Sequence, residues 1–316
     1  MSAPHVDVSV IVSAHELRRE IPRTVHSLAP PYQVGLDGTS VEIIVADNGS
    51  TVPVDAAWFA PTQAHVRVMR FPPGDPSPCA ALNAAAASAR GAALAVLIDG
   101  ARIASPGLLS RALRAMRTGD DVFVATMGFH LGPQQQQASQ LSGYSAEAED
   151  RLLDGIAWPR DGYRLFEIAA RAGSHRRGVL SDFPETTAFV MRRTTFARIG
   201  GFDERFRYRG GGLANFAFYD RVMCDASIEP VVLVGEGTFH QVHDGNTTRA
   251  GGVGRRETPD GPTIWEAMVD EFRTITGREP LAAQHLRPLL FGRCESADAE
   301  RLFFAPPEAA AAPPPA

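Results

Sequence analysis

The stretch that decides the fold is LAVLIDGA, residues 94–101, in which five apolar residues run into a single carboxylate, Asp99. An apolar run of this length is typical of a strand buried on both faces of a sheet. The small-residue segment 80–89 predicts a helix before it, and Ser105-Pro106 predicts the start of another helix after it. Because ligands of open α/β sheets bind beyond the carboxyl ends of the strands, we expect Asp99 to face a ligand.

The same alternation of apolar strands and amphipathic helices fills the first 130 residues. Four further segments rich in β-branched or other apolar residues predict buried strands: residues 6–14, 41–46, 66–71 and 122–126. Residues 16–28 and 106–117 carry apolar side chains at helical spacing. Such alternation predicts an α/β fold, a mostly parallel doubly wound sheet with helices on both faces.

The second half of the chain is less regular. The glutamine run 134–137 after Pro133 predicts a mobile surface loop. Residues 251–262 are rich in glycine, proline and charge, which indicates a linker or flap before an amphipathic helix at 264–275. We therefore expect one domain over residues 1–250, a helical C-terminal extension over 251–304, and a disordered Ala/Pro tail over 305–316.

Composition and missing motifs exclude several classes of protein. The chain has 316 residues and a formal net charge of -5, which does not suggest a nucleic-acid partner. Its three cysteines are widely spaced and indicate a reducing compartment. Without a signal-peptide pattern or a transmembrane-length apolar run, we expect a cytoplasmic location. The glycine motifs of dinucleotide-binding, P-loop and α/β-hydrolase proteins are missing from their expected places.

Five stretches, in this order and spacing, resemble the family 2 glycosyltransferases of the GT-A fold. They are residues 8–16, 42–51 (EIIVADNGST), 83–91, 94–101 and 192–206 (RRTTFARIGGFDERF), the last being the most specific. The resemblance covers residues 6–245. It implies hexosyl transfer from a nucleotide-diphosphate-sugar donor to a hydroxyl acceptor on a glycan, a lipid carrier or a small metabolite. The donor sugar, the stereochemistry and the oligomeric state remain open.

The resemblance also implies which residues bind the nucleotide sugar. They follow the first, second and fourth strands or lie on the second helix: Ser13, His15, Glu16, Asp47, Asn48, Asn83, Asp99 and Gly100. Each has a structural alternative. Asp47 is also a residue type that closes turns, and Glu16 is favoured in the first turn of a helix by the helix dipole. Asn83 is equally well read as an ordinary helix residue.

The chain departs from the family pattern at Ala101, where the family usually has a second acid that ligates a divalent metal. Mg²⁺ and Mn²⁺ require oxygen ligands, and Mn²⁺ also accepts imidazole. Asp99, His240 and His243 are therefore the candidate metal ligands. The two histidines could equally lie on the surface. A metal-independent reaction, in which a cation such as Arg102 or Arg209 neutralises the diphosphate, also stays open.

A second departure is Ala214-Asn215, where the family usually has Glu-Asp with the aspartate as catalytic base. An amide cannot accept a proton at neutral pH. Four acids are candidate substitutes: Asp182, Glu185, Asp220 and Asp244. A retaining reaction would need no such base. Because both acids are replaced, the alternative hypothesis is a non-catalytic nucleotide-sugar-binding module that partners an active transferase.

Overall fold

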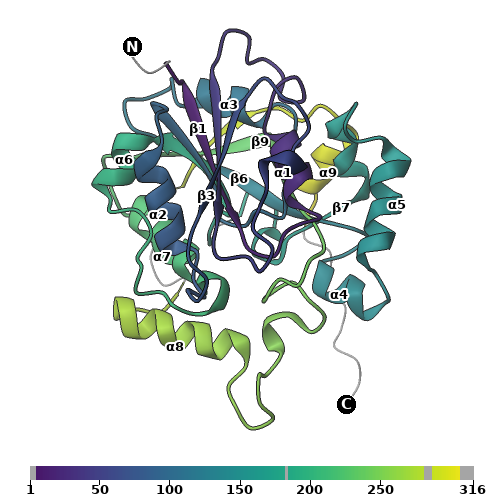
Figure 1. Ribbon diagram of the computed structural model, residues 1–316, viewed down its shortest axis with the longest axis vertical. Helices are drawn as coiled ribbons and strands as arrows, with labels where there is room; N and C mark the ends of the chain where they lie inside the picture. The colour runs from purple at the N-terminus through teal and green to yellow at the C-terminus, as the bar shows by residue number, and fades with distance from the viewer. Residues whose placement is uncertain (1–4, 182–183, 281–286, 307–316) are drawn as a thin grey trace.

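The computed structural model describes residues 5–181, 184–280 and 287–306. Within these residues the strands form one ten-stranded sheet in the order β10-β9-β6-β8-β4-β1-β2-β3, with β5 beside β9 and β7 beside β6. Helices lie on both faces of the sheet (Figure 1). The predicted α/β class, with a mostly parallel doubly wound sheet, is confirmed.

The N-terminal half of the sheet is parallel. It contains β1 (Val8–Ala14), β2 (Val41–Asp47), β3 (His65–Arg70) and β4 (Ala93–Leu97). Ala14 pairs with Asp47, and Val12 pairs with Leu97. The carboxyl ends of β1, β2 and β4 therefore meet at one edge of the sheet, as the sequence predicts for the ligand-binding edge.

The C-terminal half adds strands that cannot be placed from local sequence. β6 (Val122–Leu131) runs parallel to β9 (Glu229–His240), whereas β8 (Ala188–Arg192) is antiparallel to both β4 and β6. The short β5 (Arg102–Ala104) pairs with the end of β9, so that Arg102 lies opposite His240. β7 (Ala169–Arg171) and β10 (Leu289–Gly292) complete the sheet.

Alternating strand residues build two cores. In β4, Ala93, Ala95 and Leu97 join one apolar cluster, and Leu94 and Val96 join the other. The first cluster is covered by α1 (Ile21–Ser27) and α3 (Leu108–Ala115). The helices that cover the second include α2 (Cys79–Ser88), α6 (Arg193–Arg198), α7 (Ala214–Met223) and α9 (Ala297–Phe304). Burying both faces of the sheet supplies the main driving force for folding.

The remaining helices lie around these layers. They are α4 (Gln136–Leu141), α5 (Ala146–Ile156) and α8 (Ile264–Thr276), with 3₁₀ turns at Ala56–Trp58, Gly162–Ile168, Gly173–His175, Arg209–Gly211 and Gly252–Gly254. The predicted helix at 264–275 is confirmed as α8, at the bottom of Figure 1. Its first turn is closed by a reciprocal capping box between Thr263 and Glu266.

Two sequence predictions of local structure are wrong. The loop predicted over 134–137 ends after Gln135, because Gln136 begins α4 and is fully buried. The helix expected from residue 16 begins only at Ile21, because Glu16 takes a left-handed backbone conformation with φ 55°. Pro22 then lies in the first turn of α1, where its missing N–H has no cost.

The C-terminal extension packs on the sheet. β10 pairs in parallel with β9, and Ala299, Leu302 and Phe303 of α9 are buried in the core. The domain boundary at residue 250 stays a prediction. Of the predicted disordered tail, residues 307–316 lie outside the described residues, as does Asp182. Across the described ranges, no helix has both the length and the apolar character needed to cross a bilayer.

Candidate functional site

The site begins at the turn after β4. Asp99 lies two residues beyond the end of the strand, and its Oδ1 accepts a hydrogen bond from the backbone N–H of Ala101 at 3.0 Å. Gly100 packs so closely on β1 that a Cβ atom there would lie 1.8 Å from the carbonyl oxygen of Ser13. Only glycine fits this contact, so Gly100 sets how the ends of β1 and β4 approach each other.

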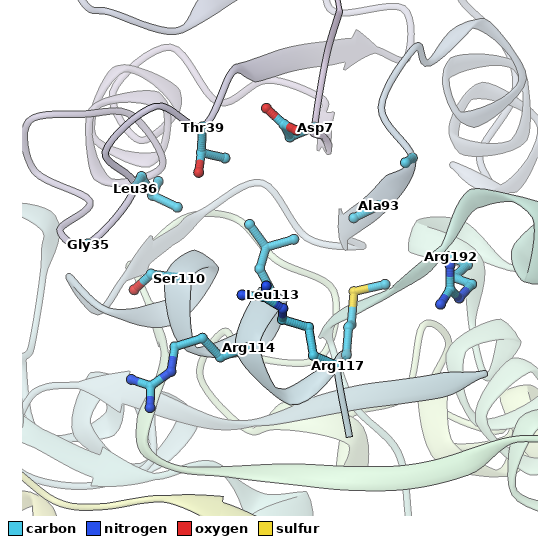
Figure 2. Close-up of a pocket in the computed structure, with 12 residues that line it drawn as sticks. Asp7, Gly35, Leu36, Thr39, Ala93, Ser110, Leu113, Arg114, Arg117 and Arg192 are labelled. Atoms are coloured by element: carbon cyan, nitrogen blue, oxygen red, sulfur yellow. The ribbon is translucent and has the colours of Figure 1, made fainter. Parts of the chain in front are cut away.

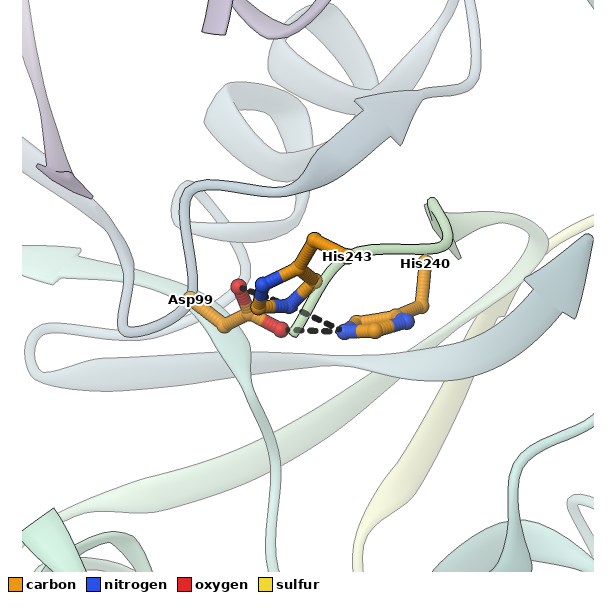
Figure 3. Close-up of side chains that lie close together, drawn as sticks. All are labelled: Asp99, His240 and His243. Atoms are coloured by element: carbon orange, nitrogen blue, oxygen red, sulfur yellow. Dashed lines mark hydrogen bonds and ion pairs between the residues drawn. The ribbon is translucent and has the colours of Figure 1, made fainter. Parts of the chain in front are cut away.

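The structure brings the three predicted metal ligands together. His240 Nε2 lies 2.8 Å from Asp99 Oδ2 and 3.1 Å from His243 Nε2. His243 Nε2 lies 3.8 Å from Asp99 Oδ1. Figure 3 shows both imidazole rings turned toward the carboxylate. One ligand atom from each residue falls within 4.8 Å of the others, which is compact enough for one ion.

The hydrogen bonds of Gln136 assign the tautomer of His240. Gln136 Nε2 donates to the backbone carbonyl of His240 at 2.8 Å, so Gln136 Oε1 is the atom that accepts from His240 Nδ1 at 2.5 Å. His240 Nδ1 therefore carries a hydrogen. In a neutral ring Nε2 then has a lone pair, which points at Asp99. Two electron-pair donors at 2.8 Å require a cation or a proton between them.

Burial and charge determine the protonation of this pair. Burial lowers the pKa of His240 to about 4, despite the opposing effect of Asp99, and so favours the neutral ring. Burial opposes ionisation of Asp99, but His240 and Arg102 hold its pKa well below the usual range. Arg102 Nε lies 3.6 Å from Asp99 Oδ2. Asp99 Oδ2 and His240 Nε2 therefore need one positive charge between them, which is either a proton on the imidazole or a bound cation.

These donors fit a divalent transition-metal ion. One carboxylate oxygen and two imidazole nitrogens suit Mn²⁺ better than Mg²⁺, which prefers oxygen ligands. The hydrogen bond from Nδ1 of a ligating histidine to a fixed acceptor is also the usual arrangement around a protein-bound metal. Asp99, His240 and His243 are therefore the residues that could hold such an ion.

Arg102 adds positive charge beside the cluster of Asp99, His240 and His243. The residue is 5% exposed, yet within the described part of the chain its Nε and Nη1 have no hydrogen-bond partner. A buried guanidinium with unsatisfied donors is costly unless an anion satisfies it. Arg102 thus places a fixed positive charge next to Asp99.

The loops predicted to bind the nucleotide adjoin the site. Many of their polar groups form hydrogen bonds within the loops themselves. Asp47 is buried, and its two oxygens accept from the backbone N–H groups of Ser50 at 3.1 Å and Val54 at 2.9 Å. Asn48 Nδ2 donates to the carbonyls of Asp75 and Ser77. Both the turn-forming alternative for Asp47 and a binding role are compatible with these contacts.

The segment after β1 folds against the same loop. His15 Nδ1 lies 3.0 Å from the carbonyl oxygen of Asn48, and Glu16 Oε1 accepts from the N–H of Thr51 at 2.6 Å. His15 and Glu16 are exposed, whereas Ser13 is buried within β1. Their nucleotide-binding roles stay predictions.

Asn83 has a structural role that the sequence does not indicate. Its Oδ1 accepts from the backbone N–H of Phe202 at 2.9 Å, and its Nδ2 donates to the carbonyl of Phe202 at 2.8 Å and to Glu204. These bonds hold α2 against the glycine turn at 200–201. The amide of Asn83 is therefore occupied within the fold.

The candidate bases lie in different environments. Asp244 has a largely exposed side chain, 3.1 Å from Arg249 Nη1. Asp220 Oδ2 lies 2.5 Å from Arg278 Nη2. Glu185 is buried, and its Oε2 accepts a hydrogen bond from Asn215 Nδ2 at 2.8 Å. Glu185 thus contacts the residue that stands where the resembling family has its base.

Gln136, Glu149 and Arg19 are site residues that sequence reasoning missed. Glu149 Oε2 accepts from the N–H of Val242 at 2.8 Å, and Arg19 Nη1 donates to the carbonyl of Val242 at 3.1 Å. Val242 lies between the two histidines, so α5 and the segment before α1 hold the histidine loop. Nothing in the local sequence indicates these contacts, because each spans more than 90 residues.

A separate hollow of about 360 Å³ lies away from this site. Figure 2 shows Asp7, Ala93, Arg114 and Arg192 among its lining residues. Asp7 precedes β1 and Ala93 begins β4, so the hollow lies at the amino-terminal edge of these strands. It is therefore at the opposite edge of the sheet from Asp99.

Comparisons with known proteins identify the family. The model of Glycosyl transferase family 2 matches residues 9–198, more than half of the chain. No curated protein matches the sequence. Similar solved structures include S. aureus TarS 1-349 in complex with UDP (TM-score 0.47, 14% identity, 75% of this chain and 61% of that chain). Another is the complex of TarS 1-349 with UDP-GlcNAc (TM-score 0.48, 13% identity, 85% and 65%).

The present chain thus spans less than two thirds of the length of these structures. The family match begins in β1 and includes the end of β4, where Asp99 lies, but ends before His240. It confirms the resemblance that the five sequence stretches indicate. The chain belongs to glycosyl transferase family 2.

Proposed function

We propose that this protein transfers a sugar from a nucleotide-diphosphate-sugar donor to a hydroxyl group of a glycan, a lipid-linked or a small-molecule acceptor. The observation that carries the proposal is the convergence of Asp99, His240 and His243 at the carboxyl end of β4. This cluster lies at the sheet edge where α/β folds bind ligands. It supplies the ligands that Ala101 cannot.

Each residue of the cluster has a definite part in the proposal. Asp99, His240 and His243 would hold a divalent cation, with Mn²⁺ the ion that best matches their donor atoms. When bound, such a cation would supply positive charge against the departing diphosphate. Arg102, buried beside Asp99, adds a fixed positive charge that favours a diphosphate at this edge. Ser13, His15, Glu16, Asp47 and Asn48 would surround the nucleotide, with Gly100 at the turn beneath it.

The test is nucleotide release from UDP-GlcNAc, GDP-mannose and dTDP-glucose in the presence of Mn²⁺. We expect turnover of at least one donor, its loss on chelation with EDTA, and a decrease of about 100-fold or more in Asp99→Asn because one ligand is removed. Asp37→Asn is the matched control, since Asp37 is exposed on a loop. Activity that survives both EDTA and Asp99→Asn would contradict the metal assignment.

The same experiment tests the alternative, a non-catalytic nucleotide-sugar-binding module. That alternative is favoured by the replacement of an acid at both Ala101 and Asn215. It predicts calorimetric binding of UDP and Mn²⁺ without nucleotide release from any donor. Turnover of one donor would exclude it.

A further inference from the structure

We propose that Glu185 is the base that takes the proton of the acceptor hydroxyl, and that Asn215 positions it. The inference rests on the proposed function and names the missing base of that reaction. Its starting point is the hydrogen bond of 2.8 Å between Asn215 Nδ2 and Glu185 Oε2. This bond joins two elements that are 30 residues apart in sequence.

The topology brings Glu185 to the edge of the sheet that holds Asp99. β8 runs antiparallel to β4, and the N–H of Ile98 donates to the carbonyl of Thr187 at 3.0 Å. The chain therefore enters β8 directly beside the turn that carries Asp99. Glu185 lies two residues before Thr187, on the segment leading into the strand from that edge.

His175 fixes the backbone of Glu185 on the Arg102 side of the site. The N–H of Gly128 donates to His175 Nδ1 at 3.2 Å, so in the neutral ring His175 Nε2 carries the hydrogen that faces the carbonyl oxygen of Glu185 at 3.2 Å. A Cβ on Gly128 would lie 3.4 Å from Arg102 Nη1 and 3.5 Å from His175 Nδ1. Arg102 and His175 therefore both lie beside Gly128. Arg102 is next to Asp99, and His175 contacts the backbone carbonyl of Glu185.

The charge environment of Glu185 differs from that of most other buried carboxylates. Glu42, Glu149, Glu236 and Asp220 each lie within 4.0 Å of an arginine nitrogen. Glu185 is 4% exposed and, within the described ranges, forms no such ion pair; its side chain is held by the neutral amide of Asn215. Burying a carboxylate without a cation is costly for stability. The Glu185 carboxylate is therefore not held in an ion pair that an acceptor hydroxyl would have to displace.

Asn215 completes the arrangement from the first turn of α7. The amino-terminal end of a helix favours a nearby negative charge. The amide donates to one oxygen of Glu185 without transferring a proton, and so it orients the carboxylate while leaving it able to accept one. The carboxylate thus lies across a hydrogen bond from Asn215, the position at which the family resemblance implies the base.

In the proposed step, the acceptor oxygen forms a bond to the anomeric carbon as the bond from that carbon to the diphosphate oxygen breaks. The electron pair of the broken bond leaves on the diphosphate. The proton of the acceptor hydroxyl moves to a carboxylate oxygen of Glu185. Because the nucleophile arrives opposite the leaving group, the anomeric configuration is inverted.

The experiment compares Glu185→Gln, Asn215→Asp and the double variant in which both changes are combined. Nucleotide release is measured from UDP-GlcNAc, GDP-mannose and dTDP-glucose with Mn²⁺, with water as the hydroxyl nucleophile. For the donors that the unaltered chain turns over, we expect kcat of Glu185→Gln to fall about 10²–10⁴-fold. The double variant places a carboxylate at residue 215, on the other side of the same hydrogen bond. We therefore expect its kcat to be at least about tenfold higher than that of Glu185→Gln.

Two further readouts separate catalysis from structure. Calorimetric binding of UDP with Mn²⁺ should stay within about twofold in Glu185→Gln, and its Tm should be unchanged or raised because the buried charge is removed. Glu167→Gln is the matched control, since its carboxylate lies in an exposed ion pair with Arg164.

Three outcomes would overturn the assignment. They are retained turnover in Glu185→Gln, a parallel loss of turnover and UDP binding with a lowered Tm, and a double variant no more active than the single one. If the unaltered chain releases no nucleotide from any donor, the proposed function itself fails and Glu185 has no proton to accept. The two failures are thus distinguished by the behaviour of the unaltered chain.

Discussion

Gln136 Oε1 lies 2.5 Å from Nδ1 of His240, a residue 104 positions later in the chain. The second hydrogen bond of the same amide, to the carbonyl of His240, holds the amide in this orientation. The contact therefore determines both the direction of the imidazole ring and the nitrogen that carries its hydrogen. Gln136 acts on the metal-ligand cluster through His240, as a positioning residue.

The first prediction concerns this positioning. Gln136→Leu keeps the approximate volume but removes both hydrogen bonds to His240, so the ring loses its fixed tautomer and orientation. We expect the Kd for Mn²⁺, measured by calorimetry, to rise about 10–100-fold. Gln137→Leu is the control, since the Gln137 amide bonds to Gln135 instead. Equal Mn²⁺ affinities in the two variants would contradict the role of Gln136.

The second prediction concerns the close approach of Gly100 to β1. A methyl group at residue 100 would lie 1.8 Å from the carbonyl oxygen of Ser13, so the turn or the strand must move. We expect Gly100→Ala to lower the free energy of unfolding by about 3 kcal/mol or more and to weaken UDP binding.

Gly155 provides the matched control for Gly100. It lies inside α5, where an added Cβ would meet nothing within 4 Å. Gly155→Ala should therefore raise the free energy of unfolding by about 0.5–1 kcal/mol. Urea denaturation measures both changes. A Gly100→Ala variant as stable as the unaltered chain would show that the turn tolerates a side chain.

The third prediction concerns the restoration of an acid at residue 101. Ala101 is fully buried in the core cluster that β1, β4 and α3 share. We expect Ala101→Asp to lower the free energy of unfolding by about 3–5 kcal/mol, because the new carboxylate has no cation beside it in the core. Ala60→Asp, at an exposed position, should change it by less than about 0.5 kcal/mol. Tighter Mn²⁺ binding with unchanged stability would contradict this prediction.

The fourth prediction concerns the pH dependence of stability. Burial raises the pKa of Glu149 to about 7, although Val242 and Arg19 oppose the shift. The folded state therefore holds an extra proton between the unfolded pKa of about 4.5 and pH 7. Its contribution to stability is fully present below pH 4.5 and is lost as pH rises through 7, a change of about 3 kcal/mol.

Glu149→Gln tests this contribution, because glutamine has the same shape and does not titrate. We expect the free energy of unfolding, measured in urea from pH 4.5 to 8, to fall less steeply with pH in the variant than in the unaltered chain. The difference between the two curves isolates Glu149 from the other titrating groups. Parallel curves would show that Glu149 is ionised throughout this range.

The sequence predicted the strands near Asp99 well because their signal is local. The runs 41–46 and 94–98 are apolar except for Glu42, and the structure places β2 and β4 there. Gln136 shows where such a signal fails. A glutamine run is compositionally typical of an exposed loop, yet the partner that buries Gln136 is a histidine on β9. Composition cannot identify a partner of this kind.

The candidate site likewise contains residues that a local sequence signal indicates and residues that only long-range strand pairing brings in. Asp99 and Gly100 could be found from sequence because they end a recognisable strand, whereas His240 and His243 were only candidates until β5 paired with β9. That pairing places Arg102 opposite His240 and brings the late histidines to the turn after β4. The contact between Glu185 and Asn215 has no sequence signal, because the two residues meet only through the entry of β8 beside α7.

By itself, the sequence determined the α/β class, the family and the position of Asp99 at the end of a buried strand. These follow from hydrophobic periodicity and short motifs, which act within a few residues. Only the tertiary structure decided which side chains surround Asp99 and that Glu185 faces the amide of Asn215 rather than an arginine. Those contacts join residues 30 to more than 100 positions apart. They exist only once the sheet has brought the ends of its strands to one edge.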